Sequence, residues 1–189
     1  DDAIQTSQAM IVSEDGFHFN NWDKKKVLPT VHDEEVGEPK MRDPKVWKDG
    51  DSYYMMMGSS YHDAGRVLFY TSKDGENWTY ANQCRPESYG WTIECPDLFS
   101  QNDQWIFIGC PMRLTPGEKK YPDQAVWALA EFDPKTCELK LPDTHSYVDY
   151  GLDLYAPQTT LDAEGRRVMI SWMRMPMAVT DSTDRPAWN

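Results

Sequence analysis

The chain alternates short apolar runs with polar turns along almost its whole length. Each run holds about four to seven apolar or aromatic residues, as in RVLFYTSKDGENW (66–78), DLFSQNDQWIFIG (97–109) and RRVMISWM (166–173). Most turns carry Asp-Gly or Asn-Asp, residues that tolerate the left-handed backbone of tight hairpins. No window of about 11 residues or more shows a helical apolar period without a Gly or Pro break. The pattern predicts an all-β protein built from hairpins.

Three segments repeat one arrangement of a polar pair, a proline, a strand, a polar turn and a second strand: RDPKVWKDGDSYYMMMGSS (42–60), ECPDLFSQNDQWIFIGCPM (94–112) and YAPQTTLDAEGRRVMISWM (155–173). Hairpin units that recur about every 50 residues are typical of β-propeller blades. The earlier stretch MIVSEDGFHFNNW (10–22) resembles the end of such a unit. A propeller closes with about four blades or more. We therefore expect residues 1–189 to form about three blades of one larger propeller domain, from the end of blade one through about blade four.

Composition narrows the classes of partner. The formal net charge of −12 opposes binding to nucleic acid phosphates and to anionic membranes. No apolar run reaches the roughly 18 residues of a membrane-spanning helix. Eight Trp in a chain that is 13% aromatic suggest flat stacking surfaces as well as core, with sugar faces or a protein interface as the partner.

The four cysteines (Cys84, Cys95, Cys110 and Cys137) form no CxxC pair, and the four His are scattered. We expect no metal site and no cofactor. Reduced thiols in a cytoplasmic protein are the favoured interpretation, with a disulfide and secretion as the alternatives. The segments SEDG (13–16) and SKDG (72–75) predict hairpin turns rather than calcium loops, because the acidic spacing of a calcium loop does not continue.

The first strand of each propeller blade lines the central channel, so matched offsets in successive repeats converge on one axis. The pairs before the three prolines therefore predict a common site for Arg42, Asp43, Glu94, Cys95 and Tyr155. Each pair alone has a simpler explanation, in which Asp43 caps a turn and Cys95 fills the core. The matched offsets favour the functional interpretation.

Two carboxyl groups that face one point suit glycoside hydrolysis. Glu94 has apolar neighbours in sequence and is the candidate acid, whereas Asp43 beside Arg42 is the candidate anion. Trp172 lies on the strand that follows Tyr155 and is either core or one wall of a sugar subsite. Two further acids near Tyr155 are weaker candidates for the rim: Asp149 and Asp153.

The motifs MRDPKVW (41–47), WTIECPDLF (91–99) and DYGLDLYAPQTTLDAEGRRVMISWM (149–173) resemble, in this order and spacing, glycoside hydrolase family 32. This family includes invertases, levanases, inulinases and sucrose-6-phosphate hydrolases. The resemblance implies a five-bladed propeller, usually followed by a β-sandwich, and a retaining mechanism on β-fructofuranosides. It also implies that Asp43 stabilises the transition state and that Glu94 is the general acid/base. Arg42 and Tyr155 would line the fructose subsite, and Cys95 would pack behind the acid.

The family's nucleophile is an Asp in a WxNDPNG-type motif, and that motif does not occur in residues 1–189. The β-sandwich is also absent, so we expect an internal part of the enzyme that is inactive alone. The expected partner is a small carbohydrate, which is sucrose, sucrose 6-phosphate or a fructan. A sugar-binding propeller without catalysis and a related arabinan or xylan furanosidase are the alternatives. The sequence does not decide among these substrates or define an oligomeric state.

Overall fold

The computed structural model describes residues 6–28, 41–114, 123–151, 153–174, 179–180 and 186–188. Within these ranges the regular structure is β-strand apart from one short 3-10 helix, Asn21–Asp23, so the predicted all-β class is confirmed. No helix in this part of the chain is long and apolar enough to cross a membrane. Most of the loop between Met112 and Val126 lies outside the described ranges.

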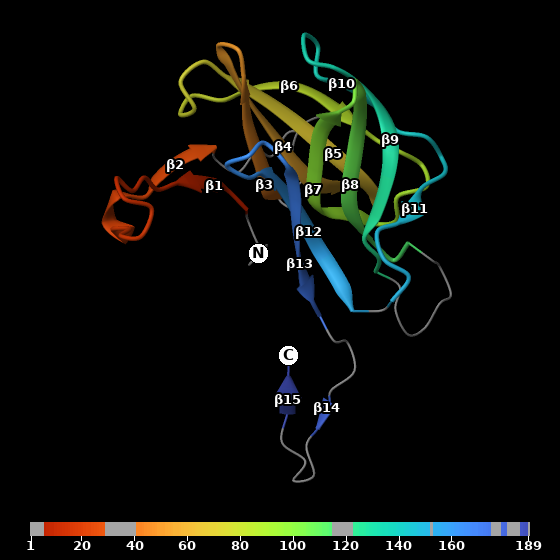
Figure 1. Cartoon of the computed structure of the whole chain (residues 1–189). Coiled ribbons are helices and arrows are strands. Elements are labelled where there is room, and N and C mark those ends of the chain that lie inside the picture. Colours follow the sequence, from red (N-terminus) through yellow and green to blue (C-terminus); the bar gives the residue numbers. More distant parts are fainter. Residues whose placement is uncertain are drawn as a thin grey trace.

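Two antiparallel sheets dominate the molecule (Figure 1). The first has four strands in chain order: β3 (Arg42–Asp49), β4 (Ser52–Tyr61), β5 (Ala64–Ser72) and β6 (Thr79–Cys84). The second follows the same order with β7 (Thr92–Gln101), β8 (Gln104–Met112), β9 (Val126–Asp133) and β10 (Glu138–Lys140), and β11 (Ser146–Tyr147) also pairs with β9. Each is an up-and-down meander of the kind that forms a propeller blade.

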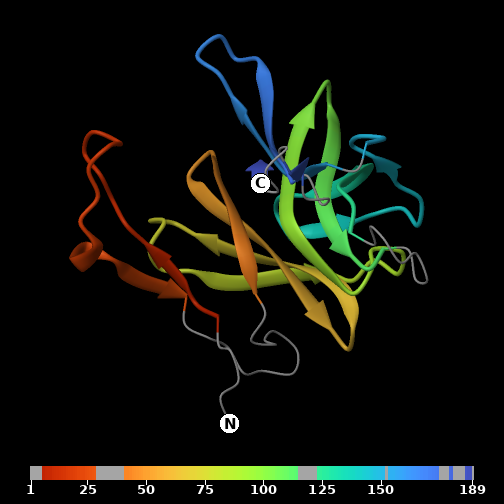
Figure 2. The same ribbon diagram turned by 90° about the horizontal axis from the view of Figure 1, so that it is seen from below.

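Three two-stranded sheets complete the fold: β1 (Gln8–Met10) with β2 (Lys25–Leu28), β12 (Leu154–Leu161) with β13 (Arg167–Met173), and β14 (Val179–Thr180) with β15 (Pro186–Trp188). Figure 2 shows the β1–β2 hairpin, the two large sheets and the β12–β13 hairpin following one another in chain order. The first strands β3 and β12 both pack against β7. The three repeats therefore meet along their first strands, as the repeat pattern predicts.

The three consecutive methionines of β4 show why the sheets stack. Met56 packs into the apolar layer between the two large sheets, which also contains Phe69 and Phe107. Met55 and Met57 point to the opposite face, because successive side chains alternate along a strand. All three are nearly or fully buried. A strand buried on both faces reads as a continuous apolar run.

Each first strand carries a β-bulge at its proline. Two residues there face one residue on the neighbouring strand: Asp43-Pro44 opposite Met57, Cys95-Pro96 opposite Gly109, and Ala156-Pro157 opposite Ser171. The residue before each proline has positive φ, 55° at Asp43, 46° at Cys95 and 50° at Ala156. A bulge accommodates proline because the missing N–H is not needed in the ladder. Positive φ at a non-glycine residue costs about 1–3 kcal/mol, and such strain concentrates at functional sites.

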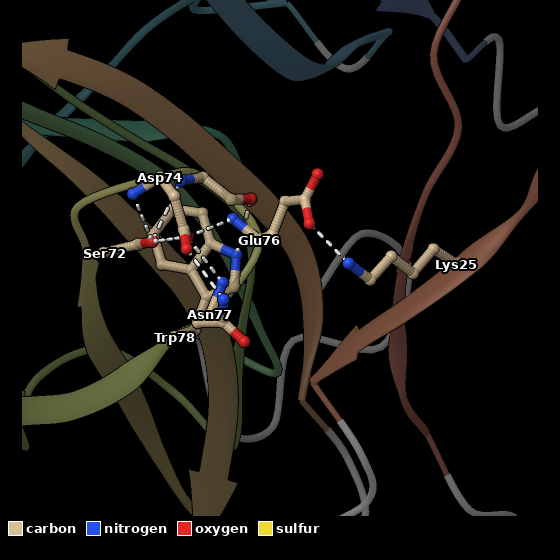
Figure 3. A network of polar contacts seen from close by, with 7 residues as sticks. Lys25, Ser72, Asp74, Glu76, Asn77 and Trp78 are labelled. Atoms are coloured by element: carbon tan, nitrogen blue, oxygen red, sulfur yellow. Dashed lines mark hydrogen bonds and ion pairs between the residues drawn. The ribbon is translucent and has the colours of Figure 1, made fainter.

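The segment 72–78 is a tight polar turn between β5 and β6, as predicted (Figure 3). The Ser72 hydroxyl donates to Asp74 Oδ1 over 2.9 Å and accepts from the Gly75 N–H over 2.9 Å. Asp74 Oδ1 also accepts from the backbone N–H groups of Glu76 and Asn77, both at 2.8 Å. These bonds lower the pKa of Asp74 well below its ordinary range. The side chains of the turn thus replace the hydrogen bonds that a ladder would supply.

The turn after β1 has the same construction. Asp15 Oδ1 accepts from the Ser13 hydroxyl over 3.0 Å and from the N–H of Phe17 over 2.9 Å. Figure 3 also shows an ion pair from Lys25 on β2 to Glu76, which links the first hairpin to the neighbouring sheet.

In the described ranges no group of three or more His, Cys, Asp or Glu is placed to hold a metal ion.

The two large sheets come into close backbone contact at Gly58, the register partner of Arg42. A Cβ atom at Gly58 would lie 2.0 Å from the carbonyl oxygen of Ile93, the residue before Glu94. Only glycine allows this contact, because any larger residue would push the two backbones apart. The separation of Arg42 and Glu94 thus depends on the absence of a side chain at this position.

Candidate active site

Three side chains from three first strands meet at the level of the bulges. Arg42 on β3 places Nη1 2.5 Å from Oε1 of Glu94 on β7. The Tyr155 hydroxyl on β12 donates to the other oxygen, Oε2, over 3.0 Å. The Glu94 side chain is 19% exposed, whereas the Arg42 side chain is 40% exposed. The carboxyl of Glu94 is therefore held at both oxygens and still reaches solvent.

Asp43 is held beside this group by the backbone of β7. Its Oδ2 accepts a 2.9 Å hydrogen bond from the N–H of Cys95 and lies 3.6 Å from the Cys95 Sγ. Cys95 directly follows Glu94 in the chain, so the residue that binds the Asp43 carboxylate is the neighbour of the residue that carries the second carboxyl group. Asp43 and Cys95 both have positive φ and lie in bulges, outside the regular strand ladder. The Asp43 carboxylate and the Cys95 N–H can therefore bond to each other. The structure thus brings Asp43, Glu94, Arg42, Cys95 and Tyr155 into one cluster.

Tyr155 is nearly completely buried, and its pKa is raised far above the ordinary value. Burial is the main cause, followed by the neighbouring Cys110 and Glu94. The phenol therefore keeps its proton and acts as a hydrogen-bond donor to Glu94. Arg174 lies over the Tyr155 ring, with Cζ 4.3 Å from its centre, and donates from Nη2 to the carbonyl of Asp123 over 3.2 Å. The sequence did not indicate this cation, because it lies after the repeat.

The four cysteines are free thiols. Cys110 is the register partner of Glu94 and is completely buried with Tyr155 against Cys95. A hydrogen bond with the Cys95 thiol, together with burial, strongly raises the pKa of Cys110. A protonated, unreactive Cys110 therefore packs beneath the cluster, while Cys95 faces Asp43.

Trp172 is the register partner of Tyr155 on β13 and is 51% exposed. Directly opposed residues on antiparallel strands share one face of the sheet. The indole therefore lies on the same face of the β12–β13 hairpin as Tyr155, and its place in the core or in a sugar subsite stays a prediction. Asp149 and Asp153 are exposed, and the carbonyl of Asp153 accepts from the backbone N–H of Arg174. Among the described residues, no hydrogen bond or ion pair joins the side chain of either acid to Glu94.

The stretch leading into β7 adds an aromatic group that the sequence did not single out. Trp91 stands three residues before Glu94, and its Nε1 donates to Asp63 Oδ1 over 2.7 Å. Arg113 lies over the Trp91 ring, with Cζ 4.7 Å from its centre. These side chains come from the hairpin after β4 and the end of β8. Trp91 is therefore fixed by a carboxylate from one large sheet and a guanidinium from the other.

A groove of about 640 Å³ opens farther along the same first strands, between Lys45–Asp49, Leu98–Ser100 and Thr159–Leu161. It lies past the bulges and does not include Glu94 or Asp43. A large volume alone therefore does not identify the chemical site here. The concentration of carboxyl, guanidinium and phenol groups at the bulges does.

The cluster has the parts of an acid/base site. One carboxyl (Glu94) is fixed by two donors, a second (Asp43) stands nearby against a backbone N–H, and an arginine and a tyrosine line the space between strands. A sugar ring that develops positive charge is stabilised by a nearby anion, and a fixed carboxyl can exchange a proton with its leaving oxygen.

The chain is similar in sequence to known proteins. The sequence profile for "Glycosyl hydrolases family 32 N-terminal domain" matches residues 1–189. The sucrose-6-phosphate hydrolase of Salmonella typhimurium is 37% identical over 145 residues, which cover 72% of this chain and 31% of that protein. The sucrose-6-phosphate hydrolase of Escherichia coli is 33% identical over 181 residues, 93% of this chain and 36% of that protein. The chain thus spans about a third of the length of the curated relatives it matches.

Solved structures match as well. The Bombyx mori glycoside hydrolase family 32 β-fructofuranosidase superposes with a TM-score of 0.72 at 31% identity, over 96% of this chain and 42% of that one. A variant of the same enzyme in complex with sucrose gives a TM-score of 0.70 at 32% identity, over 89% of this chain and 39% of that one. The sucrose-6-phosphate hydrolase of Lactobacillus gasseri gives a TM-score of 0.78 at 23% identity, over 97% of this chain and 38% of that one. The fold is that of the β-propeller neighbours, as the repeats predicted.

Proposed function

Because the chain belongs to glycosyl hydrolase family 32, we propose that it forms part of the catalytic propeller of a retaining β-fructofuranosidase. The observation that carries this proposal is the convergence of Arg42, Glu94 and Tyr155 from three blades, with Asp43 bonded to the residue after Glu94. The pattern supplies the acid/base and the stabilising anion that hydrolysis of a fructosyl bond requires.

The proposed substrate is a small carbohydrate with a terminal β-fructofuranosyl group. Relatives named sucrose-6-phosphate hydrolase and a neighbouring structure that binds sucrose support sucrose or its 6-phosphate. Fructans are a further candidate from the family resemblance. The proposed location is cytoplasmic, with secretion as the alternative.

In the proposed mechanism, Glu94 gives its proton to the glycosidic oxygen as the bond to fructose breaks. Tyr155 donates to Oε2 and Arg42 pairs with Oε1, so the carboxylate seen here must take up a proton and loosen its pair with Arg42 before it acts as the acid. Asp43 stabilises the positive charge that develops on the fructosyl ring. A retaining enzyme also needs an attacking carboxylate about 5–5.5 Å from the acid, and the family's motif for it does not occur in residues 1–189. That carboxylate bonds to the fructosyl carbon as the glycosidic bond breaks, and Glu94 then takes a proton from the water that cleaves this ester and releases fructose.

The decisive experiment replaces Glu94 by Gln in the intact enzyme. Loss of the acid/base lowers kcat on sucrose by about 10²- to 10⁴-fold, with fructose affinity and melting temperature nearly unchanged. The exposed Glu87→Gln variant is the control and keeps the parent rate. Near-normal turnover by Glu94→Gln contradicts the assignment.

Two other outcomes identify the alternatives. If calorimetry shows that the intact protein binds fructose while no fructoside is cleaved, the protein is a sugar-binding propeller without catalysis. If sucrose, sucrose 6-phosphate, inulin and levan are inert but arabinan or xylan is cleaved, it is a related furanosidase. Release of fructose from sucrose or sucrose 6-phosphate supports the proposal.

A further inference from the structure

A second polar cluster lies directly past the bulges, on the same three first strands. It contains the residue that follows each proline of the repeat, together with one neighbour: Lys45, Asp97, Gln158 and Thr159. We call these four residues the support layer. None of them belongs to the acid/base cluster described above.

Lys45 and Asp97 join all three strands. Lys45 Nζ on β3 lies 3.1 Å from Asp97 Oδ1 on β7 and donates to the carbonyl of Thr159 on β12 over 2.6 Å. The other oxygen of Asp97 accepts from the Thr159 N–H over 2.6 Å. The Asp97 side chain is fully buried, and that of Lys45 is 18% exposed. One ammonium and one carboxylate therefore tie a strand of each repeat to the other two.

Gln158 attaches this layer to the backbone that carries Glu94. Its Nε2 donates to the carbonyl of Cys95 over 3.1 Å and lies 3.4 Å from the carbonyl of Pro96. The bulge removes these carbonyl groups from the strand ladder, and buried carbonyl groups need a partner. Gln158 provides it, so the peptide that follows Glu94 is fixed from a neighbouring strand.

Stability alone is a weak reason for such a pair. Replacement of a buried ion pair by well-packed apolar residues is often neutral or stabilising, whereas removal of one partner is costly. The pair can instead fix how the three strands are placed relative to one another. Only long-range contacts relate these strands, and Arg42, Glu94 and Tyr155 meet only if the strands are correctly aligned along their length. Misplacement of a catalytic group by about 1 Å can cost about 10²-fold in rate.

We propose that Lys45, Asp97 and Gln158 are positioning residues that set the mutual placement of Glu94, Arg42 and Tyr155. The proposal rests on the proposed β-fructofuranosidase function. It goes beyond that function because it assigns the relative alignment of the three strands to the support layer, which lies outside the acid/base cluster.

The test compares kcat, KM and melting temperature on sucrose in the intact enzyme. The single variants Lys45→Met and Asp97→Asn lower both stability and kcat. The double variant Lys45→Met/Asp97→Leu removes both charges, so its melting temperature recovers toward the parent. A positioning role keeps kcat of the double variant about tenfold or more below the parent, with KM within about twofold. The control Lys48→Met, at an exposed lysine of the same strand, keeps the parent rate.

A folded double variant whose kcat lies within about twofold of the parent overturns the proposal, because the layer would then serve stability alone. If the double variant does not fold, Gln158→Leu decides, since it removes the bonds to the Cys95 and Pro96 carbonyls without burying an unpaired charge. We expect its kcat to fall about tenfold with the fold intact, and an unchanged rate overturns the proposal. A parent enzyme that cleaves no fructoside overturns the proposed function and this inference together, whereas an active parent with active variants overturns the inference alone.

Discussion

The Tyr155 hydroxyl donates a 3.0 Å hydrogen bond to Glu94 Oε2 across 61 positions of the chain. The bond joins β12 to β7, so it forms only when two repeats are correctly placed side by side. It also fixes the direction of the Glu94 carboxyl from the buried side, opposite the more exposed Arg42. The site is thus assembled between repeats rather than within one of them.

Tyr155→Phe removes this bond and keeps the ring packed beneath Arg174. We expect kcat on sucrose to fall about tenfold, since a hydrogen bond contributes about 1 kcal/mol and the carboxyl also loses its orientation. Steady-state kinetics and a melting curve check this, with the exposed Tyr150→Phe as the matched control. A Tyr155→Phe enzyme as fast as the control would show that Arg42 alone orients Glu94.

Asp43→Asn removes a negative charge while its side-chain oxygen still accepts from the Cys95 N–H. We expect the fold to persist and kcat to fall about 10²-fold or more, because the developing positive charge on the sugar loses its anion. The rate on sucrose, compared with that of the exposed control Asp51→Asn, measures the effect. Equal rates in the two variants contradict a role for Asp43 in catalysis.

Gly58→Ala forces apart the strands that carry Arg42 and Glu94. The new Cβ would meet the Ile93 carbonyl at 2.0 Å, whereas at Gly151 the nearest atom is the movable Oδ2 of Asp149, at 2.8 Å. We expect Gly58→Ala to lower the free energy of unfolding by about 2 kcal/mol or more and to lower kcat, while Gly151→Ala changes little. Denaturant unfolding and kinetics of both variants test this. A neutral Gly58→Ala would show that the contact between the sheets is not tight.

His145 makes stability depend on pH. Its ring lies 5.1 Å from that of Tyr89 and 6.5 Å from that of Tyr147, and burial lowers its pKa below the ordinary 6.5. As pH falls below about 6.5, the unfolded chain takes up this proton before the folded one does, so the contribution of His145 is full above that pH and is lost as pH falls through its folded-state pKa.

Denaturant unfolding between pH 7.5 and 5 in the parent and in His145→Phe measures this contribution. We expect the free energy of unfolding to fall less steeply toward pH 5 in the variant. Parallel curves for the two proteins would mean that the folded and unfolded states bind the proton of His145 equally.

The sequence predicts the parts of the structure that repeat. Alternating apolar runs with Asp-Gly turns indicate the hairpins, and the shared proline aligns Arg42, Glu94 and Tyr155 before any coordinates are known. Matched offsets work here because each repeat contributes the same strand to the same axis.

The sequence does not predict contacts that depend on the bulge itself. A residue before proline favours extended backbone, so the positive φ at Asp43, Cys95 and Ala156 runs against the local rule. Lys45 and Asp97 look like ordinary strand residues, and their ion pair exists only because β3 and β7 pack together. Arg174 follows the last repeat and reaches Tyr155 through tertiary packing alone.

The bulge at each proline also allows the residues beside it to vary without loss of the strand pairing on either side. In each strand the two bulged residues are one variable residue and the proline, and the residue before them keeps its partner on the neighbouring strand. The paired residue and the first bulged residue together are Arg-Asp in one unit, Glu-Cys in the next and Tyr-Ala in the third. The chemical groups at this position can thus change by substitution of a dipeptide while the hairpin stays the same. The dipeptides before the prolines are therefore suitable positions for the redesign of sugar specificity.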